Sequence, residues 1–446
     1  MSIVIKAGTI ITANQNRDIL TNTSVVIDNN RISGIYPENT ELKNSGSEVI
    51  DATGLILIPG FIQTHLHLCQ TLFRGLADDL QLLDWLQLKI FPMEAAHNAQ
   101  SMFSSALIGI AELIRSGTTT ILDMGSVNYQ EEIIRAIGET GFRAFVGKAM
   151  MDVNELYPPL KESTADSLRS TKTLAEQWHN SFNGRIKYAV APRFVLSCSD
   201  SLMQEAYELT SDSSGILFHT HASENKNEIE KVFERCGMAN IEFLNKLGIL
   251  SNRSVLAHCV HLNKNEFSIL QDTKTNVSHC PSSNLKLGSG IADVPALLSK
   301  NISVSIGADG APCNNTLDLF QEMRLASLIQ KPFYGSTSMP AETIFRMATI
   351  NGAHALGIAN EIGSIELGKK ADLVLLDLEN IFNPLLPSKN LYSSIVHSAS
   401  PENVDSVMID GKWVYRKKEN ITSDIEKIRH DAKKELHKLI SRIESY

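Results

Sequence analysis

The sequence predicts an α/β fold: a distorted (β/α)8 (TIM) barrel flanked by a discontinuous small β-sandwich domain that both ends of the chain form. Two observations support this prediction. Eight strand-like apolar runs alternate with helix-length segments through the middle of the chain, and short strands separated by turns occupy both ends. The 446 residues are enough for one large domain and a smaller one.

The small domain is predicted to combine residues 1–57 with residues 364–420. In the first segment, apolar stretches such as Val25-Val26-Ile27 are interrupted by turn residues such as Asp28-Asn29-Asn30, as in short strands. In the second segment, Asp410-Gly411 lies between two apolar runs and is typical of a hairpin turn. We therefore expect the two ends to pair in one domain.

The barrel is predicted over residues 58–363, where strand-like runs lead into segments long enough for helices. Segment 100–116, for example, ends at Gly117, a residue typical of helix C-termini. An open doubly wound sheet is the alternative, but no G-x-G-x-x-G pattern follows any run. The eight runs are 55–65, 118–123, 143–150, 186–191, 215–221, 254–259, 275–280 and 302–309.

The last segment, 421–446, is predicted to form a separate C-terminal helix. Its residues 423–444 are amphipathic at helical spacing. Ser423-x-x-Glu426 at its start matches a capping box, the pattern with which helices often begin.

The composition argues against several classes of protein. The net charge of −9 disfavours a general nucleic-acid binder, which needs a basic face. No apolar run reaches the roughly 18–20 residues of a membrane span, and the N-terminus lacks the layout of a signal peptide. The six cysteines form no C-x-x-C pair, which favours reduced thiols over a disulfide framework. We therefore expect a cytoplasmic protein that binds neither nucleic acid nor membranes.

Histidines and acids cluster where the predicted barrel strands end. His65-Leu66-His67 closes the first run, and residues two apart on a strand share a face. Barrels place their catalytic groups at the carboxyl ends of the strands. A lone histidine there is more often a hydrogen-bonded core residue than a ligand, but the convergence of five strand ends favours a metal site. The other ends carry His219, His221 and Glu224 (fifth), His258 (sixth), His279 (seventh) and Asp309 (eighth).

The residue types at these ends indicate hydrolytic metal chemistry. Three neutral imidazoles and one carboxylate suit a zinc-like ion that keeps a position open for water, whose pKa it lowers to about 7. Glu224, three residues past His221, is expected to lie beside the metal and to move a proton between water and substrate. Asp309 is expected to bind the metal and accept the proton of the water, and His258 to orient the hydroxide.

These motifs resemble the amidohydrolase superfamily, in its mononuclear-metal deaminase branch. The segment 363–374 is similar to that superfamily's return into the β domain. The resemblance implies one divalent metal ion per subunit, zinc with iron as the alternative. No lysine ends the fourth run, which favours one metal over two. The implied metal ligands are His65, His67, His221 and Asp309, and the implied catalytic residues are Glu224, His258 and Asp309.

Within this branch, segments 71–80, 283–291 and 309–315 are most similar to deaminases of 5′-modified adenosines: methylthioadenosine, S-adenosylhomocysteine and 5′-deoxyadenosine. The implied products are the inosine analogue and ammonia. Glu94 is then expected to hold ribose hydroxyls, with a solvated helix-end carboxylate as the alternative. Arg143 is expected to face the substrate, with a structural salt bridge as the alternative. The residues implied to bind substrate are Trp85, Glu94, Arg143, Arg193, Glu224 and His279, the last with a structural role as the alternative.

One element departs from the adenosine-type pattern. Those enzymes usually carry a Gly-Pro-His element after the fourth strand, where this chain has Ala191-Pro192-Arg193-Phe194. That element is similar to guanine deaminase, in which the arginine contacts the guanine. Arginine always donates and suits a ring carbonyl, whereas histidine can donate or accept. Guanine, or another amino-heterocycle such as a pterin, cytosine or a triazine, is therefore the alternative substrate.

Two alternatives from other functional classes remain. One is a cyclic-amide hydrolase such as a dihydropyrimidinase or an imidazolonepropionase, of which the first would have a bridging lysine and two metals. The other is a barrel that has lost catalysis and acts as a scaffold. The retained metal set and Glu224 argue against the scaffold. The expected partner is a small-molecule substrate. Barrels of this branch are often dimers, which makes a homodimer the candidate assembly.

Overall fold

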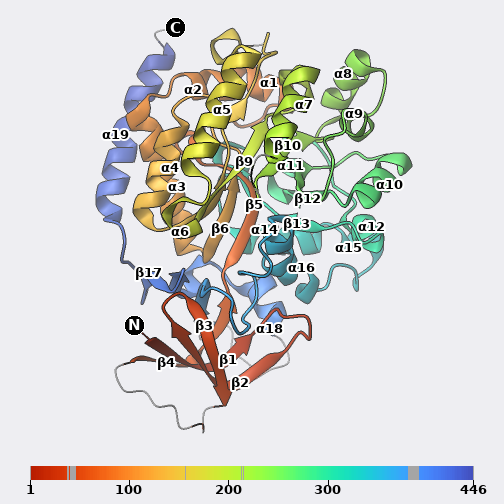
Figure 1. Ribbon diagram of the computed structural model, residues 1–446. Coiled ribbons are helices and arrows are strands. Elements are labelled where there is room, and N and C mark those ends of the chain that lie inside the picture. The colour runs from red at the N-terminus through yellow and green to blue at the C-terminus, as the bar shows by residue number, and fades with distance from the viewer. Residues whose placement is uncertain are drawn as a thin grey trace.

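The structure is a computed structural model, which describes residues 2–37, 40, 47–155, 157–211, 213, 215–379 and 391–444. It contains two sheets (Figure 1). The small sheet holds the N-terminus, and a parallel barrel surrounded by helices lies beside it. The predicted α/β barrel fold and the small domain built from both chain ends are confirmed.

The small domain consists of one continuous eight-stranded sheet. Its strand β4 is parallel to β1 and antiparallel to β15, so the two chain ends meet across β4. Alternate residues of β4 serve two cores: Leu57 packs within the small domain, whereas Ile56 and Ile58 pack against the barrel. The predicted hairpin turn joins β16 to β17, with Asp410 and Gly411 both at positive φ. In sheet order the strands are β18 Glu419–Asn420, β17 Lys412–Arg416, β16 Val404–Ile409, β15 Leu373–Leu376, β4 Glu48–Pro59, β1 Ser2–Ile11, β2 Ile19–Asp28 and β3 Arg31–Pro37.

The second sheet closes into a parallel barrel. Its last strand position is divided: β13 pairs with β12, and β14 pairs with β5, which joins the last strand to the first. The short strand β8 (Ala149–Met150) lies off the ring and pairs with β9. Around the ring the strands are β5 Phe61–His67, β6 Thr118–Asp123, β7 Arg143–Val146, β9 Ile186–Pro192, β10 Leu217–Ala222, β11 Ser254–His258, β12 Asn276–His279, β13 Val304–Ile306 and β14 Asp309–Gly310.

The predicted runs from 118 onward correspond to barrel strands, but the first run, 55–65, is wrong as a single strand. Its residues up to Pro59 belong to β4 of the small sheet, and the barrel strand β5 begins at Phe61. Gly60 between them lies so close to Thr119 that a Cβ would sit 2.1 Å from the threonine hydroxyl oxygen. A glycine therefore lets the chain pass from one sheet into the other without a loop.

Helices cover the outside of the barrel. The helix α3 begins with a capping box between Asn98 and Ser101 and ends just before Gly117, as predicted. The C-terminal helix α19 lies along α3, and the Nε of its Arg442 donates to the Ala96 carbonyl at 2.6 Å. In the described part of the chain, no helix is both long and apolar enough to cross a membrane. The helices are α1 Leu82–Trp85, α2 Phe91–Ala95, α3 Ala99–Arg115, α4 Gln130–Thr140, α5 Thr164–Trp178, α6 Ser181–Gly184, α7 Asp200–Glu208, α8 Lys226–Cys236, α9 Asn240–Lys246, α10 Lys264–Thr273, α11 Pro281–Lys286, α12 Val294–Ser299, α13 Ala311–Asn314, α14 Leu319–Leu328, α15 Lys331–Tyr334, α16 Ala341–Met347, α17 Ile350–Ala355, α18 Leu391–Ser393 and α19 Ile425–Glu444.

The division of the chain at 57/58, 363/364 and 420/421 stays a prediction, and parts of the terminal ranges lie outside the described residues. The six cysteines are all described, and all are free thiols.

The amino-terminal end of the barrel is filled by apolar side chains. Barrel strands contribute Ile62, Leu122, Phe145, Ala189, Leu217 and Val255, which pack against buried residues of segment 350–362. Above this layer the Thr64 hydroxyl lies 2.7 Å from the hydroxyls of Ser278 and Ser305. The interior thus changes from apolar to polar toward the carboxyl ends of the strands, where barrels carry their active sites.

Arg143 is the first residue of β7 and lies at the end of the barrel away from that polar region. Its Nε and Nη2 donate to the Asp372 carboxylate at 2.6 and 3.0 Å, and Nη2 also donates to Asp410 at 3.3 Å. All three side chains are buried. The prediction that Arg143 faces the substrate is therefore wrong, and the structural salt bridge is the correct alternative, joining the barrel to the small sheet.

We expect Arg143→Leu to destabilise the fold by about 3–5 kcal/mol, because it leaves Asp372 buried without a counter-charge and removes one of the two arginines that face Asp410. Urea unfolding followed by circular dichroism measures this loss. Arg169→Ala is the matched control, because its partner Asp166 is exposed, and it should leave the unfolding midpoint unchanged. A variant of Arg143 with normal stability and weakened substrate binding would contradict the structural role.

Candidate active site

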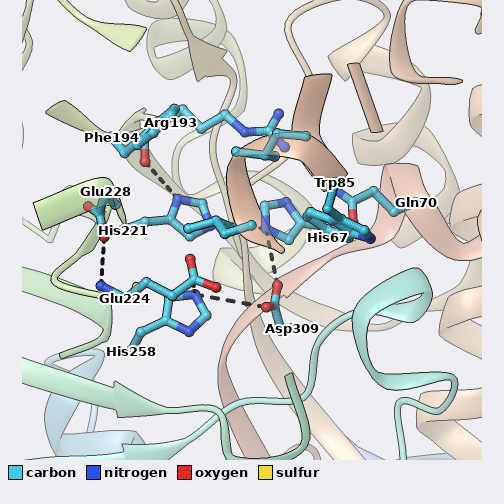
Figure 2. Close-up of a pocket in the computed structure, with 12 residues that line it drawn as sticks. His67, Gln70, Trp85, Arg193, Phe194, His221, Glu224, Glu228, His258 and Asp309 are labelled. Atoms are coloured by element: carbon cyan, nitrogen blue, oxygen red, sulfur yellow. Dashed lines mark hydrogen bonds and ion pairs between the residues drawn. The ribbon is translucent and has the colours of Figure 1, made fainter. Parts of the chain in front are cut away.

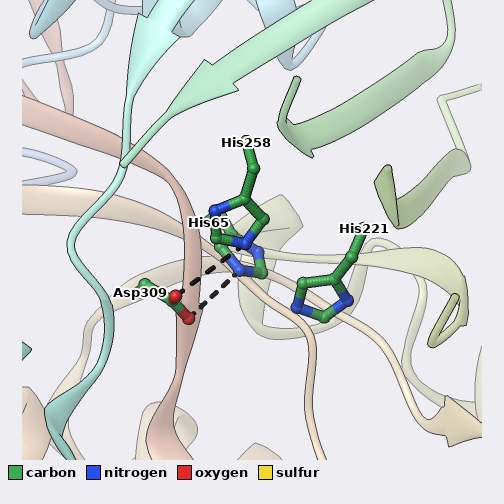
Figure 3. Close-up of side chains that lie close together, drawn as sticks. All are labelled: His65, His221, His258 and Asp309. Carbon is green, nitrogen blue, oxygen red and sulfur yellow. Dashed lines mark ion pairs between the residues drawn. The ribbon is translucent and has the colours of Figure 1, made fainter. Parts of the chain in front are cut away.

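Several strand ends bring metal-binding side chains to one point at the carboxyl end of the barrel (Figure 3). His65 of β5, His221 of β10, His258 of β11 and Asp309 of β14 offer ligand atoms that all lie within 4.8 Å of one another. His67 joins them, since its Nε2 lies 3.4 Å from Asp309 Oδ1 and 3.3 Å from His221 Nε2. The five side chains that the sequence singled out for metal and water thus lie together.

The spacing of these atoms is that expected around a tetrahedral cation. His65 Nε2 lies 3.3 Å from Asp309 Oδ1, close to the two contacts of His67. Atoms bound at about 2.0–2.1 Å to a tetrahedral zinc ion lie roughly 3.3–3.4 Å apart. His258 Nε2 is more distant, 3.8 Å from Asp309 Oδ2 and 3.5 Å from Glu224 Oε2. The distances therefore favour the other histidines as ligands and leave His258 beside them.

Hydrogen bonds behind two of the rings fix which nitrogen is free. His221 Nδ1 lies 2.7 Å from the Arg193 carbonyl oxygen, and His258 Nδ1 lies 2.8 Å from Asn284 Oδ1. Both oxygens can only accept, so each ring donates from Nδ1 and keeps a lone pair on Nε2. Nε2 of His65 and Nε2 of His258 are buried without a hydrogen-bond partner. Buried lone pairs that point to one place fit a bound cation and its water.

The environment favours neutral rings and an ionised carboxylate. Burial, followed by the neighbouring imidazoles, holds the pKa of His67 and His221 well below the usual histidine value. Burial alone would raise the pKa of Asp309, but its contacts with His65, His258 and His67 outweigh burial and hold that pKa well below the usual value. Neutral imidazoles and a carboxylate are the forms that bind metal ions.

Glu224 is held beside the cluster by the turn that follows β10. Ser223 takes a positive φ of 53°, and the Glu228 carboxylate accepts a hydrogen bond from the Glu224 backbone N–H at 2.7 Å. Burial, then the Asp309 and Glu228 carboxylates, raise the pKa of Glu224 well above its usual value. Glu224 is thus a buried acid within 3.5 Å of His258 Nε2, placed to carry a proton.

A pocket lies over the cluster (Figure 2). It is covered by α1 and by the π-helical turn Leu86–Ile90 that continues it. Trp85, predicted to bind substrate, lines the pocket, and its indole N–H donates to the Ala77 carbonyl at 3.1 Å. The lining residues are His67, Gln70, Leu82, Trp85, Leu86, Arg193, Phe194, His221, Glu224, Glu228, His258 and Asp309.

Glu94 is not among the residues that line this pocket, and its carboxylate is hydrogen-bonded to two neighbouring side chains. Arg193 Nη1 and Nη2 donate to its two oxygens at 2.6 and 3.0 Å, and Gln70 Nε2 donates to Oε1 at 2.7 Å. The three side chains are buried. The predicted grip of Glu94 on ribose hydroxyls has no support in this arrangement, and the alternative of a solvated carboxylate is wrong. Glu94 instead fixes Arg193 and Gln70, which do line the pocket.

His279 is buried, with neither ring nitrogen hydrogen-bonded, and it does not line the pocket. The contact of His279 with substrate stays a prediction.

Sequence reasoning missed the lining residues Gln70 and Glu228. Gln70 follows His67 by three residues, and Glu228 follows Glu224 by one helical turn at the start of α8. Both spacings were available as signals, since polar residues that close to a ligand often face the same cavity.

The segment between β13 and β14 can approach β5 because residue 307 is glycine. A Cβ there would lie 2.5 Å from the His65 carbonyl oxygen and 2.9 Å from the backbone nitrogen of His65.

We expect Gly307→Ala to push Asp309 away from His65 and to weaken metal binding by about tenfold or more, measured by chelator competition. Gly54→Ala is the control, because a Cβ there meets nothing within 4 Å. An unchanged metal affinity in Gly307→Ala would show that the strands tolerate separation.

Comparisons with known proteins place this site in a family. Residues 56–414 match the amidohydrolase family. A 5′-deoxyadenosine deaminase of Methanothermobacter thermautotrophicus is 41% identical over 394 residues, which cover 88% of this chain and 89% of the relative. A 5-methylthioadenosine/S-adenosylhomocysteine deaminase of Thermoanaerobacter pseudethanolicus is 36% identical and covers 99% of this chain and 100% of its own.

Solved structures agree with this assignment. An adenosine deaminase from Xanthomonas campestris with bound zinc matches with a TM-score of 0.90 at 29% identity, covering 100% of this chain and 99% of its own. An E. coli guanine deaminase matches with a TM-score of 0.83 at 28% identity, covering 93% of this chain and 99% of its own. The resemblance predicted from the motifs is confirmed: the chain belongs to the amidohydrolase family.

Proposed function

We propose that this chain is a metal-dependent hydrolytic deaminase of a 5′-modified adenosine, which it converts with water to the inosine analogue and ammonia. The observation that carries the proposal is the placement of a buried acid, Glu224, and of His258 beside His65, His67, His221 and Asp309, with a pocket over them. Relatives at 36–41% identity over most of the chain, named deaminases of such nucleosides, support the substrate class.

One divalent ion per subunit fits the donor set, with zinc preferred over iron because imidazole and carboxylate ligands in tetrahedral spacing suit zinc. We assign its binding to His65, His67, His221 and Asp309. When bound, such an ion acts as a Lewis acid that lowers the pKa of water to about 7. The zinc in the Xanthomonas campestris adenosine deaminase supports this choice of metal.

The surrounding residues then divide the proton transfers. Glu224 donates a proton to the ring nitrogen next to the amino-bearing carbon, which makes that carbon electrophilic. Asp309 accepts a proton from the attacking water. His258 donates from Nδ1 to Asn284, so its Nε2 can only accept, and it orients the water by accepting a hydrogen bond. The water oxygen adds to the carbon. Asp309 then passes its proton to the amino group, and the C–N bond breaks to release ammonia. Glu224 takes back the hydroxyl proton of the adduct as the ring carbonyl forms.

The walls of the pocket favour an uncharged 5′ substituent. The helix α1 and the turn that continues it contribute Leu82, Trp85 and Leu86 to the wall of the pocket. Among the described lining residues, Arg193 is the single arginine or lysine, and its guanidinium is already paired with Glu94 at 2.6 Å. Among these residues the zwitterionic tail of S-adenosylhomocysteine would find no free counter-charge for its carboxylate, so entry of the tail into the pocket would be costly. We infer that 5′-deoxyadenosine and methylthioadenosine are better substrates than S-adenosylhomocysteine.

Arg193 also favours a second candidate, deamination of guanine. Its guanidinium lies in the pocket wall and always donates, which suits a ring carbonyl. Glu94, which would otherwise hold ribose, is occupied by this same arginine. The likeness to E. coli guanine deaminase supports the candidate, and pterin, cytosine and triazine substrates stand as alternatives on the same argument. A homodimer and a cytoplasmic location stay predictions of the sequence.

We expect Glu224→Gln to lower kcat by about 10²–10⁴-fold, because the amide keeps the shape of the side chain and cannot deliver a proton. Ammonia release measures turnover, and metal analysis should still find about one ion per subunit. Glu230→Gln, on the exposed face of the helix α8 that follows Glu224, is the matched control. Normal turnover by Glu224→Gln would refute the mechanism, and two ions per subunit would favour a cyclic-amide hydrolase.

We expect kcat/KM for 5′-deoxyadenosine and methylthioadenosine to exceed that for S-adenosylhomocysteine by about tenfold or more, since the lining residues offer the zwitterionic tail of the last no free cation. The panel includes adenosine and guanine, and purine absorbance follows each reaction. Equal rates with S-adenosylhomocysteine would contradict the charge argument. A higher kcat/KM for guanine than for every adenosine would replace the first candidate by the second.

A further inference from the structure

His219 forms a hydrogen-bonded pair with the metal-site histidine of another strand. It lies on β10 two residues before His221, so both side chains point into the barrel. Its Nε2 is 2.8 Å from Nδ1 of His65, and its ring is fully buried. On its other side, Nδ1 of His219 is 2.9 Å from the carbonyl oxygen of Val255. The mechanism above does not use this residue.

The backbone determines the protonation of this pair. The Val255 carbonyl can only accept, so His219 must carry its proton on Nδ1, which leaves a lone pair on its Nε2. That lone pair can only accept, so His65 must donate from its own Nδ1. Nε2 of His65 then has a free lone pair, and this is the atom that lies 3.3 Å from Asp309 Oδ1 without a hydrogen bond. The chain of two imidazoles thus begins at a peptide group and ends at the metal site.

The register of the strands keeps the two hydrogen-bonded imidazoles in place. His219 and Val255 are direct partners in the parallel pairing of β10 with β11, so the accepting carbonyl cannot move without the sheet. A carboxylate, the more usual partner of a ligand histidine, would add a negative charge near Asp309 and Glu224. A neutral imidazole orients His65 without that charge.

We propose that His219 is a positioning residue that holds His65 in the tautomer and orientation needed to bind the metal ion. The proposal rests on the metal site assigned above. It predicts that the hydrogen-bonding pattern of residue 219 matters, rather than its size or its charge.

The test compares two substitutions of His219. His219→Gln keeps an acceptor for His65 and a donor for Val255, whereas His219→Leu fills the space and removes both. We expect His219→Leu to weaken zinc affinity by about 10–100-fold in chelator competition, and His219→Gln to restore it to within a few-fold of the parent. His97→Leu is the control, because His97 is also buried and is hydrogen-bonded to Ser101 and the Cys69 carbonyl rather than to a residue of the cluster.

Equal zinc affinity in His219→Leu and the parent, or equal weakening in both variants, would overturn the proposal and leave His219 as a packing residue. Should His219→Leu fail to fold, nitrogen-15 NMR of the histidine-labelled, zinc-loaded parent decides: protonation of Nδ1 in both His65 and His219 is expected, and a proton on His65 Nε2 contradicts it. These measurements need no substrate. A parent that binds zinc without deaminating adenosines would thus refute the proposed function alone, whereas a parent without zinc affinity would refute the metal site.

Discussion

The site depends on the pairing of β14 with β5, which closes the barrel between its last strand and its first. This pairing places Asp309 opposite Leu66, between the two histidines of the first strand. Asp309 takes a positive φ of 62°, and its carboxylate accepts hydrogen bonds from the Gly310 N–H at 2.7 Å and the Ser283 hydroxyl at 2.5 Å. Without closure, the ligand atoms of the first and last strands would belong to opposite edges of an open sheet, and no cation could bind both.

Most charges at the site are oriented by a partner from a different strand or helix. Arg193 at the end of β9 is matched by Glu94 from α2, and Glu228 from α8 fixes the backbone at Glu224. Buried polar groups are costly unless they are satisfied, and a satisfied network is stiff. The same stiffness explains why consecutive residues His258 and Cys259 can hold positive φ values of 75° and 47°, which an isolated strand end would not adopt.

The sequence predicted the barrel and the metal cluster because both depend on local patterns. Apolar runs reveal strands, and ligands at strand ends must converge in a barrel. It could not show that the first run changes sheets, since apolar residues lie on both sides of Gly60, Leu55 to Ile58 before it and Phe61 and Ile62 after it. The partner of Glu94 lies 99 residues away, and no spacing rule links it to Arg193. The prediction that Arg143 faces the substrate is wrong, although the sequence holds the signal against it. Arg143 begins β7 and does not end it, which places it at the end of the barrel away from the metal cluster.

The continuity of the small sheet has a consequence for the order in which the chain can fold. Pro59 at the end of β4 pairs with Leu373 of β15, so the centre of that sheet lacks one neighbour until almost the whole barrel has been synthesised. At roughly 5–20 residues per second, this apolar strand edge stays exposed on the ribosome for tens of seconds. The barrel strand β5 starts two residues beyond Pro59. During that interval the free edge of β4 must be kept from pairing with strands of other chains.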